Sequence, residues 1–381
     1  MTKEYLRKEI WNGKRLSKNE EYYKCLDELE KIGEFVIKPG LERIEAIMEN
    51  LGNPEKKLKT IIVGGTNGKG TTCHKLEDLI KNNNLKVGCF TSPHLHTIRE
   101  RFRIDGKIIK KNEFVEIFNL VNKVAKKNEI TVTYFEITTA MAYLYFEKNR
   151  VDLAVMEVGM GGEFDAVNIG RGDIVVLTTL GLDHIEYLGN TIEKIGTTKG
   201  KIVKEYSEVV TGWQKENWRY IPKCVQIQFG DDSDEWTEQV SKLLGVKYEK
   251  RKIEIPGRME KHDNFILDGA HNFQALERLM KSLEKIENVI FSCMEDKDVE
   301  RMISTMPKSV ELLLSPMKNK RGMAVKEMIK AAELNQNKYR SYDSIEDAIK
   351  SIDDEKTLIT GSYYSVSEAR EIMKMDGSGE Y

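Results

Sequence analysis

One segment constrains this chain more than any other: residues 61–72 read IIVGGTNGKGTT, an apolar run followed by a glycine-rich turn with one lysine. A strand, a turn and a helix start of this kind let backbone N–H groups converge on phosphate oxygens at the positive end of the helix dipole. Lys69 supplies a cation, and a hydroxyl of Thr71 or Thr72 supplies a magnesium ligand. The segment therefore predicts a nucleoside triphosphate site made by Gly65, Thr66, Asn67, Gly68, Lys69, Gly70, Thr71 and Thr72.

The turn departs from the general phosphate-loop pattern G-x-x-x-x-G-K-[ST]. Val63 occupies the first glycine position, and Gly70 separates Lys69 from Thr71. The alternative interpretation is a tight strand-to-helix turn without a ligand. A lone lysine among three glycines has little packing reason to be there, so we favour a variant phosphate loop.

Apolar runs alternate with amphipathic stretches along most of the chain. The first alternation predicts strands at 60–63, 86–91, 153–157 and 174–178 and helices at 70–82, 112–127, 136–148 and 191–196. The second, after Pro256, predicts strands at 265–267, 289–292, 310–314 and 358–360 and helices at 274–285, 297–305, 324–334 and 344–351. Strands separated by helices form βαβ units with parallel strands.

The two alternations predict an α/β fold with two domains. Residues 1–254 would form an N-terminal phosphate-loop ATPase domain around a mainly parallel sheet, and residues 255–381 a smaller, Rossmann-like C-terminal domain. The segment 204–254 is poorly patterned, so the boundary is placed near Ile255. Ligands of such sheets gather at the carboxyl ends of the strands, so the polar residues there are the candidates for a site.

The composition excludes several classes of protein. The 381 residues carry 60 Lys and Arg against 62 Asp and Glu, so the chain has no net positive charge that would attract nucleic acid or an anionic membrane. Residues 1–16 lack an apolar signal core, no run is long enough to span a bilayer, and the five cysteines are scattered. We therefore expect a cytoplasmic protein with no nucleic acid and no membrane as partner. Separately, we expect a monomer that acts on small molecules.

Two strand ends of the first domain carry candidate metal ligands. Glu157 ends one buried strand, and Asp183 and His184 follow another. We expect these strands to be neighbours, which would bring Glu157 and His184 together beside the Thr71 hydroxyl. Such a mixed oxygen and nitrogen set suits Mg²⁺ or Mn²⁺ better than zinc. A structural histidine is the alternative for His184.

Other polar residues of the first domain suit an anionic substrate. The loop Ser92-Pro93-His94 precedes a basic stretch that begins at Arg99, for which a solvated edge strand is the alternative. Asp165 lies in the turn that follows Glu157. Glu136 opens a helix, where it could instead complement the helix dipole.

The second domain repeats the pattern of polar residues at strand ends. Arg258 could reach a triphosphate, Asp268 could contact ribose or adenine, and His271 could meet a second substrate. A plain helix N-cap is the alternative for Asp268 and Asn272. Ser362 closes the last strand in the same manner.

Taken together, the motifs resemble the folylpolyglutamate synthase/dihydrofolate synthase family, which is related to the Mur ligases. The matching segments occur in family order across nearly the whole chain: GLERIEAIMENLGNPEKKLKTIIVGGTNGKGTT (40–72), TSPHL (91–95), ERFRIDG (100–106), TYFEITTAMAYLYF (133–146), EVGMGGEFDAVN (157–168), LGLDHIEYLGNTIEKI (180–195), PGR (256–258), LDGAHN (267–272), EDKD (295–298) and TGSYYSVSEAR (360–370).

The resemblance implies an ATP- and magnesium-dependent amide ligase. In this family ATP phosphorylates a substrate carboxylate, and the amine of glutamate then attacks the acyl phosphate, releasing ADP and phosphate. Electrostatic clamping of the transferred phosphoryl group would come from Lys69, magnesium and Arg258. Lys199 aligns with a lysine that the family often carries as a carbamate, which would make it an anion that bridges magnesium.

The family motifs also imply roles for the remaining residues. Catalytic roles fall on Lys69, His184, Lys199 and His271. Magnesium would be held by Thr71, Glu157 and His184, and the nucleotide would be contacted from the second domain by Arg258 and Asp268. Substrate contacts would come from Ser92, Pro93, His94, Arg99, Phe135, Glu136, Asp165 and Ser362, with His271 and Ser362 on the glutamate side.

Four departures from the family pattern lie outside the phosphate and metal motifs. Glu163 and Val167 stand where the family usually has a cation and a hydroxyl, and the residues on either side of Lys199 differ. Phe273 replaces a proline, and the segment 204–255 is short and lacks the HQ-x-x-NA motif. These segments make substrate and interdomain contacts in the family.

Our preferred hypothesis is a ligase of the folylpolyglutamate synthase type, which adds glutamate to a folate. A near alternative is a paralogue that joins another carboxylic acid and amine by the same chemistry. An alternative from another class is a nucleotide-binding module without turnover. ADP release that depends on both an acid and an amine would distinguish a ligase from a binding module.

Overall fold

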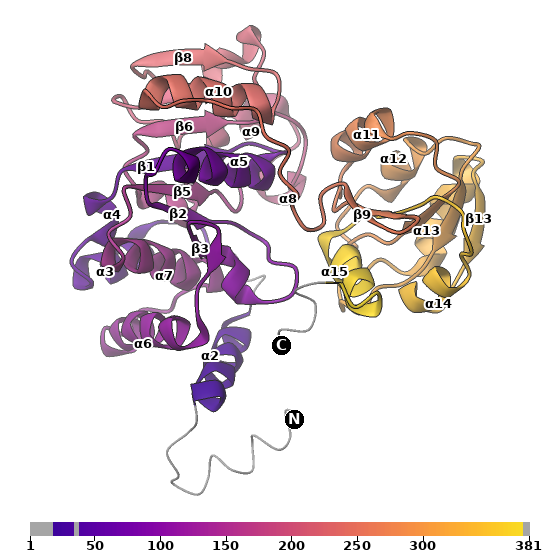
Figure 1. The fold of residues 1–381 in the computed structure, drawn as a ribbon, viewed down its shortest axis with the longest axis horizontal. Coiled ribbons are helices and arrows are strands. Elements are labelled where there is room, and N and C mark those ends of the chain that lie inside the picture. The colour runs from indigo at the N-terminus through magenta and orange to yellow at the C-terminus, as the bar shows by residue number, and fades with distance from the viewer. Residues whose placement is uncertain (1–17, 34–37, 376–381) are drawn as a thin grey trace, which may run out of the picture. The chain divides into compact units, whose positions relative to one another are not determined.

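The computed structural model describes residues 18–33 and 38–375, which form two compact units (Figure 1). The first unit contains the described residues up to Ser92 together with Arg99–Arg251, and the second contains Pro93–Ile98 and the described residues from Lys252 onward. The short segment 93–98, which the sequence analysis places in the first domain, is thus part of the second unit.

An eight-stranded sheet forms the centre of the first unit. Its strands lie in the order β4 (Lys107–Ile108), β3 (Phe102–Ile104), β2 (Val87–Phe90), β5 (Leu153–Glu157), β1 (Thr60–Gly64), β6 (Ile174–Leu177), β7 (Glu208–Thr211) and β8 (Gln226–Phe229). The strands from β2 to β8 run parallel, and β3 and β4 are antiparallel at one edge. The carboxyl ends of β5, β1 and β6 therefore meet at one edge of the sheet, on either side of the glycine-rich turn.

Helix α5 (Lys69–Asn82) connects the glycine-rich turn to the core. It begins after Gly68, and its apolar face packs on the sheet through Cys73, Leu76 and Ile80. The other helices of this unit are α2 (Lys18–Ile32), α3 (Glu42–Asn50), α4 (Pro54–Lys57), α6 (Lys111–Lys127), α7 (Tyr134–Lys148), α8 (Ile185–Leu188), α9 (Ile192–Gly200) and α10 (Ser233–Leu244), with 3-10 turns at Ala166–Ile169 and Lys215–Tyr220. A further 3-10 turn, Ile98–Arg101, begins at the last residue of the segment 93–98 and continues into the first unit.

A smaller sheet forms the centre of the second unit. Its order is β13 (Lys338–Ser341), β12 (Glu311–Leu314), β11 (Asn288–Phe291), β14 (Thr357–Thr360), β10 (Phe265–Leu267) and β9 (Glu260–His262), parallel except for β9. Its helices are α11 (Phe273–Ser282), α12 (Val299–Ser304), α13 (Val325–Leu334), α14 (Ile345–Lys350) and α15 (Tyr363–Ile372). Two apolar clusters of buried residues hold these layers together.

The predicted α/β fold is confirmed, and the strands and helices of both alternations lie within a few residues of their expected positions. The description of 204–254 as poorly patterned is wrong, because β7, β8 and α10 lie there. Strand β8 is a short edge strand with no fully buried residue, so it lacks the apolar run of a central strand. Helix α10 is amphipathic and begins at the N-cap Asp232, whose side chain accepts two backbone N–H bonds.

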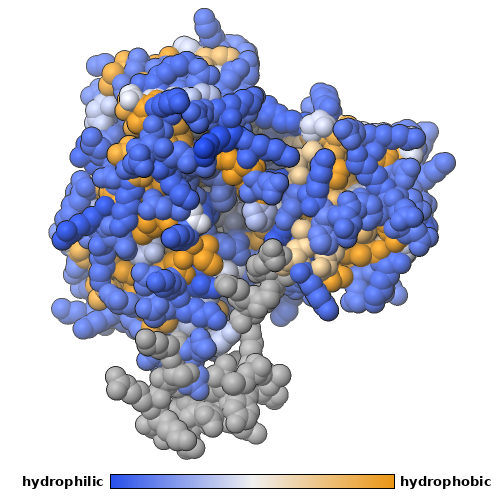
Figure 2. Space-filling model, viewed as in Figure 1, coloured by the Kyte–Doolittle hydropathy of each residue, from blue (hydrophilic) through white to orange (hydrophobic). Residues whose placement is uncertain are grey.

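The visible surface of both units is largely hydrophilic, with apolar residues scattered over it (Figure 2). Within residues 18–33 and 38–375, no helix has both the length and the apolar character that crossing a bilayer requires. The expected lack of a signal sequence concerns residues 1–16, which lie outside the described part of the chain.

Candidate active site

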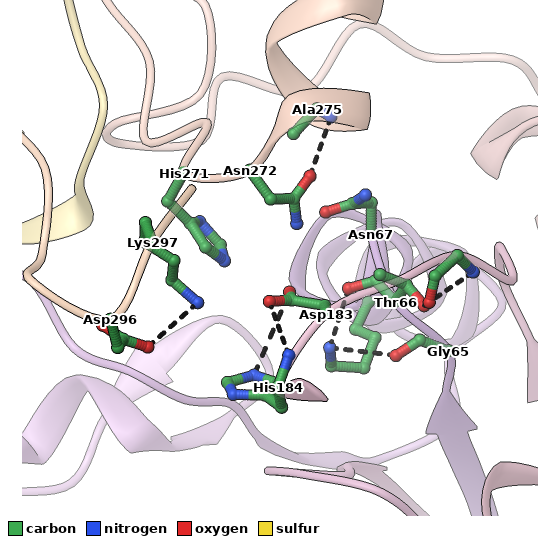
Figure 3. A network of polar contacts seen from close by, with 12 residues as sticks. Gly65, Thr66, Asn67, Asp183, His184, His271, Asn272, Ala275, Asp296 and Lys297 are labelled. Carbon is green, nitrogen blue, oxygen red and sulfur yellow. Dashed lines mark hydrogen bonds and ion pairs between the residues drawn. The ribbon is translucent and has the colours of Figure 1, made fainter. Parts of the chain in front are cut away.

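The glycine-rich turn after β1 is fixed to the turn after β6. Gly65 has a φ of +129°, and a β-carbon built on it would lie 2.0 Å from the Thr178 hydroxyl oxygen, so only glycine fits there. The backbone N–H of Thr66 donates to the Thr179 carbonyl at 2.7 Å, and that of Asn67 donates to the Thr179 hydroxyl at 2.9 Å. Figure 3 shows Gly65, Thr66 and Asn67 at the start of the helix. This shape suits phosphate binding at a helix N-terminus.

Lys69 lies over this turn. Its ammonium group donates to the carbonyls of Gly65 and Thr66, both at 3.2 Å. Thr72 is buried, and its hydroxyl donates to the Gly68 carbonyl at 2.8 Å within the helix. The hydroxyl of the half-buried Thr71 has no hydrogen-bond partner in the described part of the chain. Of the two threonines left open by the sequence, Thr71 is therefore the one with a hydroxyl available to a metal ion.

Trp236 supports the turn from beneath, and the sequence analysis did not anticipate it. Its ring is buried, and a β-carbon built on Gly68 would lie 3.4 Å from it. The same ring lies against Gly212, and its indole N–H donates to the Gly230 carbonyl at 2.6 Å. The helical spacing of apolar residues in α10, such as Trp236 and Val240, is the sequence pattern that could have predicted this buried face. The short segment 204–254 therefore supports the phosphate loop.

Glu157 lies beside the N-terminus of α5. It is the last residue of β5 and is buried, and its Oε2 accepts the backbone N–H of Ser92 at 2.9 Å. A β-carbon built on Gly70 would lie 3.7 Å from each carboxylate oxygen. The ring of Phe135 packs against Gly159 in the following loop, 2.7 Å from a β-carbon built there. A carboxylate, a helix N-terminus and a partly exposed aromatic ring therefore occur at one end of this sheet.

The expected pairing of the strands that carry Glu157 and His184 is wrong, because β1 lies between β5 and β6. The physical reason is that β1 and its glycine-rich turn occupy the centre of the sheet, with β5 and β6 on either side. The backbone N–H of His184 donates to the Asp183 carboxylate at 2.9 Å, and the His184 Nε2 lies 4.0 Å from that carboxylate (Figure 3). Within residues 18–33 and 38–375, no three His, Cys, Asp or Glu side chains form a metal-binding cluster.

Lys199 on α9 is a buried cation beside the same turn. Its Nζ donates to the Gly65 carbonyl at 3.0 Å. Burial, and then the positive charge of Lys69, lower the pKa of Lys199 to about 7. A substantial fraction of this side chain is therefore a neutral, nucleophilic amine at neutral pH.

Two of the predicted substrate residues have structural partners. Both carboxylate oxygens of Asp165 accept backbone N–H groups, at 2.9 and 3.0 Å, and burial raises the pKa of Asp165 to about 6. Glu136 forms a reciprocal capping box with Thr133 at the start of α7, and it pairs with Arg43 at 2.9 Å. The helix-capping alternative for Glu136 therefore has direct support.

The basic stretch that begins at Arg99 is buried, so the alternative of a solvated edge strand is wrong. Strand β4 forms the edge in place of β3. Arg99 donates to the Ile109 carbonyl at 3.2 Å, and Arg103 pairs with Glu77 at 2.9 Å. Glu77 lies 26 residues from Arg103 in the sequence, and the acceptor of Arg99 is a backbone carbonyl. The pattern of charged residues alone therefore does not reveal either acceptor.

The predicted substrate loop 92–94 is divided between the units, with its first residue in the first unit and the other two in the second. The continuation of the loop is fixed within the second unit. There the Ser367 hydroxyl donates to the Leu95 carbonyl at 2.6 Å, and Arg370 donates to the His96 ring at 3.0 Å.

The turn after β10 carries the predicted residues of the second unit. Asp268 is buried, and its two oxygens accept the backbone N–H groups of Met259 and Ala270, both at 2.9 Å. Burial raises the pKa of Asp268, although Arg258 opposes the shift. The Nδ1 atom of His271 lies 2.9 Å from the Gly269 carbonyl. Asp268 therefore holds the shape of the turn.

Two predicted polar residues of this unit cap helices. The Asn272 side chain accepts the backbone N–H of Ala275 at 2.9 Å (Figure 3), which bears out the N-cap alternative. Ser362 is buried and caps α15. Arg258 lies over the ring of Tyr363, 4.7 Å from its centre.

Two of the departures from the family pattern form one contact. Glu163, which stands where the family has a cation, pairs with Lys201 at 2.6 Å. Lys201 lies two residues after Lys199, and the backbone N–H of Glu163 donates to the Thr198 carbonyl at 3.0 Å. The exchange of charge at position 163 is therefore matched by a lysine within reach.

Comparisons with known proteins identify the family of this chain. The Mur ligase middle domain matches residues 63–274, and the Mur ligase glutamate ligase domain matches residues 257–361. A dihydrofolate synthase/folylpolyglutamate synthase of Bacillus subtilis is 30% identical over 89% of this chain and 96% of its own length. The crystal structure of a bifunctional folylpolyglutamate synthase/dihydrofolate synthase from Yersinia pestis, complexed with AMPPNP and a manganese ion, is 25% identical.

The fold matches these structures over almost the whole chain. The Yersinia pestis structure aligns with a TM-score of 0.80 over 95% of this chain and 100% of that one. An Escherichia coli protein in complex with DHPP and ADP aligns with a TM-score of 0.84 over 93% of this chain and 97% of that one, at 24% identity. The chain belongs to the Mur ligase family and, within it, to the folylpolyglutamate synthase/dihydrofolate synthase group of ATP-dependent ligases.

Proposed function

We propose that the protein adds L-glutamate to a folate by way of an acyl phosphate. A carboxylate oxygen of the folate attacks the γ-phosphorus of ATP, and the bond from that phosphorus to ADP breaks. The amino nitrogen of glutamate then attacks the acyl carbon, phosphate leaves, and the proton of the amine passes to solvent. The observation that carries the proposal is the Glu157 carboxylate beside Gly70 at the N-terminus of α5, in the turn that holds Lys69 and Thr71.

The glycine-rich turn would bind the triphosphate. Its backbone is fixed through Thr179, which accepts the N–H groups of Thr66 and Asn67, so the turn keeps its shape. The first N–H groups of α5, which have no acceptor within a helix, remain to bind phosphate. Lys69 donates to two carbonyl oxygens of the turn, and charged phosphate oxygens are stronger acceptors for an ammonium group than carbonyls. We expect Lys69 to transfer these bonds to the β- and γ-phosphates.

The donor set beside α5 fits a magnesium ion. Glu157 offers a carboxylate, Thr71 offers a hydroxyl, and phosphate oxygens and water would complete the oxygen shell that Mg²⁺ prefers. His184 is the third ligand we propose, on the ground that it lies in the loop after β6. When bound, the ion would neutralise phosphate charge as the phosphoryl group is transferred.

We also propose that Lys199 is carbamylated. The neutral amine would attack carbon dioxide, form an N–C bond and lose a proton to water, leaving an anionic carbamate. The burial of Lys199 and its lowered pKa support this, because only the neutral amine reacts. The new anion would lie beside the carbonyl of Gly65, close to the expected phosphates.

In the second unit, we propose Arg258 as a phosphate contact. Its guanidinium group is held over Tyr363, which fixes its direction. We assign Asp268 to the nucleotide, and His271 and Ser362 to glutamate, on the basis of the family motifs. We further propose that the protein is a cytoplasmic monomer, which the five free cysteines support as far as the compartment is concerned.

The test is product formation by the purified protein. Phosphate release is followed with ATP, Mg²⁺ and glutamate, with and without tetrahydrofolate, and the folate products are weighed by mass spectrometry. We expect phosphate release that requires both glutamate and folate, together with a product one glutamate heavier. Binding of ATP without turnover on any folate or on dihydropteroate would contradict the proposal and favour another acid.

A further inference from the structure

We propose that Arg103 and Thr91 position the Glu157 carboxylate for the metal ion through a relay of buried hydrogen bonds. The relay lies wholly within the first unit, and neither residue is assigned a role above. The inference rests on the proposed function, because it takes Glu157 to be a metal ligand. Arg103 and Thr91 are positioning residues here, since they act through Ser92 and Glu157.

Arg103 is the centre of the relay. It is only 7% exposed, yet its guanidinium group has a partner on each nitrogen. Nε donates to Glu77 at 2.9 Å, Nη1 donates to the Thr91 hydroxyl at 3.0 Å and to the Glu100 carbonyl at 2.9 Å, and Nη2 donates to the Cys89 sulfur at 3.1 Å. A planar guanidinium with this many partners has one orientation.

Glu77 connects the relay to the phosphate-binding helix. It is buried and lies on α5, the helix that begins at Lys69. Its second carboxylate oxygen accepts the backbone N–H of Gly106 at 2.9 Å, so both oxygens are used. The ion pair of Glu77 and Arg103 therefore fixes α5 against β3.

Thr91 connects Arg103 to Glu157 through its hydroxyl and the neighbouring Ser92 N–H. It follows the last residue of β2, and its backbone N–H donates to the Arg101 carbonyl at 3.2 Å while its hydroxyl accepts from Arg103. Both the backbone and the side chain of Thr91 are therefore held. The planar peptide between residues 91 and 92 carries the Ser92 N–H, and only the ψ torsion of Thr91 separates it from these held groups, so the direction of this N–H is restricted. The Ser92 N–H donates to Glu157 at 2.9 Å.

Glu157 depends on this support because it lies beside a helix N-terminus that also attracts its charge. The hydrogen bond from Ser92 fixes the plane of the carboxylate. Partners behind a metal ligand typically change metal affinity by about 10–100-fold when they are lost. We therefore expect loss of the Thr91 hydroxyl to weaken metal binding by about tenfold.

The test compares Thr91→Val with Thr91→Ser. Valine has nearly the shape of threonine without the hydroxyl, and serine keeps the hydroxyl. Mn²⁺ affinity is measured by calorimetry with saturating AMPPNP, and the half-saturating Mn²⁺ concentration for ADP formation is measured alongside. A matched control is Thr60→Val. Thr60 is also a buried threonine of this sheet, whose hydroxyl accepts a backbone N–H at 2.7 Å, but it lies at the amino end of β1.

We expect Thr91→Val to weaken Mn²⁺ about tenfold, with kcat at saturating Mn²⁺ and KM for the folate unchanged. Thr91→Ser and Thr60→Val should bind Mn²⁺ like the unmodified protein. If Thr91→Val unfolds, Arg103→Lys replaces it, because lysine keeps the charge beside Glu77 and loses the bond to Thr91.

Equal Mn²⁺ affinity in Thr91→Val and the unmodified protein would overturn the relay, as would equal losses in Thr91→Val and Thr91→Ser. An Arg103→Lys variant that binds Mn²⁺ normally would do the same. Failure of the proposed function has a different signature, in which the unmodified protein itself does not bind Mn²⁺ with AMPPNP.

Discussion

Two turns of this molecule have similar sequence patterns and use their polar groups differently. Residues 65–68 follow the buried strand β1 and lead into α5, and residues 268–272 follow β10 and lead into α11. In the first turn, the ammonium groups of Lys69 and Lys199 both donate to the carbonyl of Gly65. In the second, the carboxylate of Asp268 accepts two backbone N–H groups of its own unit.

The first turn can therefore exchange its hydrogen-bond partners when a ligand binds, whereas the hydrogen bonds of the second turn hold its shape. Two ammonium groups on one neutral carbonyl repel each other, and this repulsion is relieved by a phosphate anion or by conversion of Lys199 to a carbamate. A buried carboxylate that accepts two N–H groups has no comparable repulsion to relieve, and its removal leaves those donors unpaired. Substitutions in the first turn should therefore affect turnover, and substitutions in the second should affect stability.

The largest expected effect is that of Lys69→Ala. Loss of the phosphate-binding cation should reduce ADP formation by about 10³-fold or more. The thermal midpoint should move by no more than about 2 °C, since Lys69 makes only two bonds to carbonyls. Rates of ADP release and thermal unfolding are measured together. Lys56→Ala, at an exposed lysine in α4, is the control. Retained activity would contradict the assignment of the phosphate loop.

Asp268→Ala should produce the next largest effect, on the stability of the second unit. Two buried N–H groups lose their acceptor, which should cost about 2–4 kcal/mol. The tryptophans of the described residues, Trp213, Trp218 and Trp236, lie in the first unit, so their fluorescence follows that unit, while circular dichroism follows both units. Urea unfolding should shift in the second signal and not in the first. Asp268→Asn keeps one acceptor and should recover part of the loss. An unshifted transition would show that Asp268 does not hold the turn and would leave the proposed nucleotide contact as its role.

Lys199 beside the first turn should make both activity and stability depend on pH near and above neutrality. Protonation of Lys199 below its pKa of about 7 prevents carbamylation, so ADP formation should fall about tenfold per pH unit below that value. In the unfolded chain the pKa returns to 10.5, so unfolded Lys199 binds an extra proton between pH 7 and 10.5. Its contribution to the free energy of unfolding therefore rises with pH across that window.

Lys199→Met tests both effects. The variant should lose activity at every pH and should lack the rise in stability between pH 7 and 9. Carbon-13 bicarbonate should label the unmodified protein with one carbamate signal that the variant lacks. A pH profile of unfolding that is identical in the two proteins would show that Lys199 has an ordinary pKa.

The smallest expected effect is that of Asn272→Ala in the second turn. Loss of the N-cap of α11 should cost about 1 kcal/mol, seen in the same circular dichroism transition. Asn272→Asp keeps the cap and serves as the control. A larger loss of activity than the folded fraction explains would show that Asn272 also contacts a ligand.

Much of the fold follows from the sequence because central parallel strands are continuous apolar runs. The strands at 153–157 and 265–267 have the bounds that the sequence predicts. Strand β8 and helix α10 were missed, since an edge strand lacks that run and the packing of Trp236 under a distant glycine is a tertiary feature.

The site was predictable where one segment carries its own chemistry, as the glycine-rich turn does. It was not predictable where function depends on a partner far along the chain. Arg103 has the charge of a surface residue, and its burial is explained by its pairing with Glu77, on another element, together with three further acceptors. Likewise, the sequence could not tell that β1 separates the strands of Glu157 and His184.

The central claim is that the first turn directs transfer of a phosphoryl group to a carboxylate. The most direct measurement uses a folate whose reacting carboxylate carries heavy oxygen, with ATP, Mg²⁺ and glutamate, and determines the isotope content of the released phosphate. An acyl phosphate leaves one carboxylate oxygen in the phosphate, so we predict one heavy oxygen in each phosphate released. Phosphate without the label, formed together with the glutamate adduct, would contradict the account.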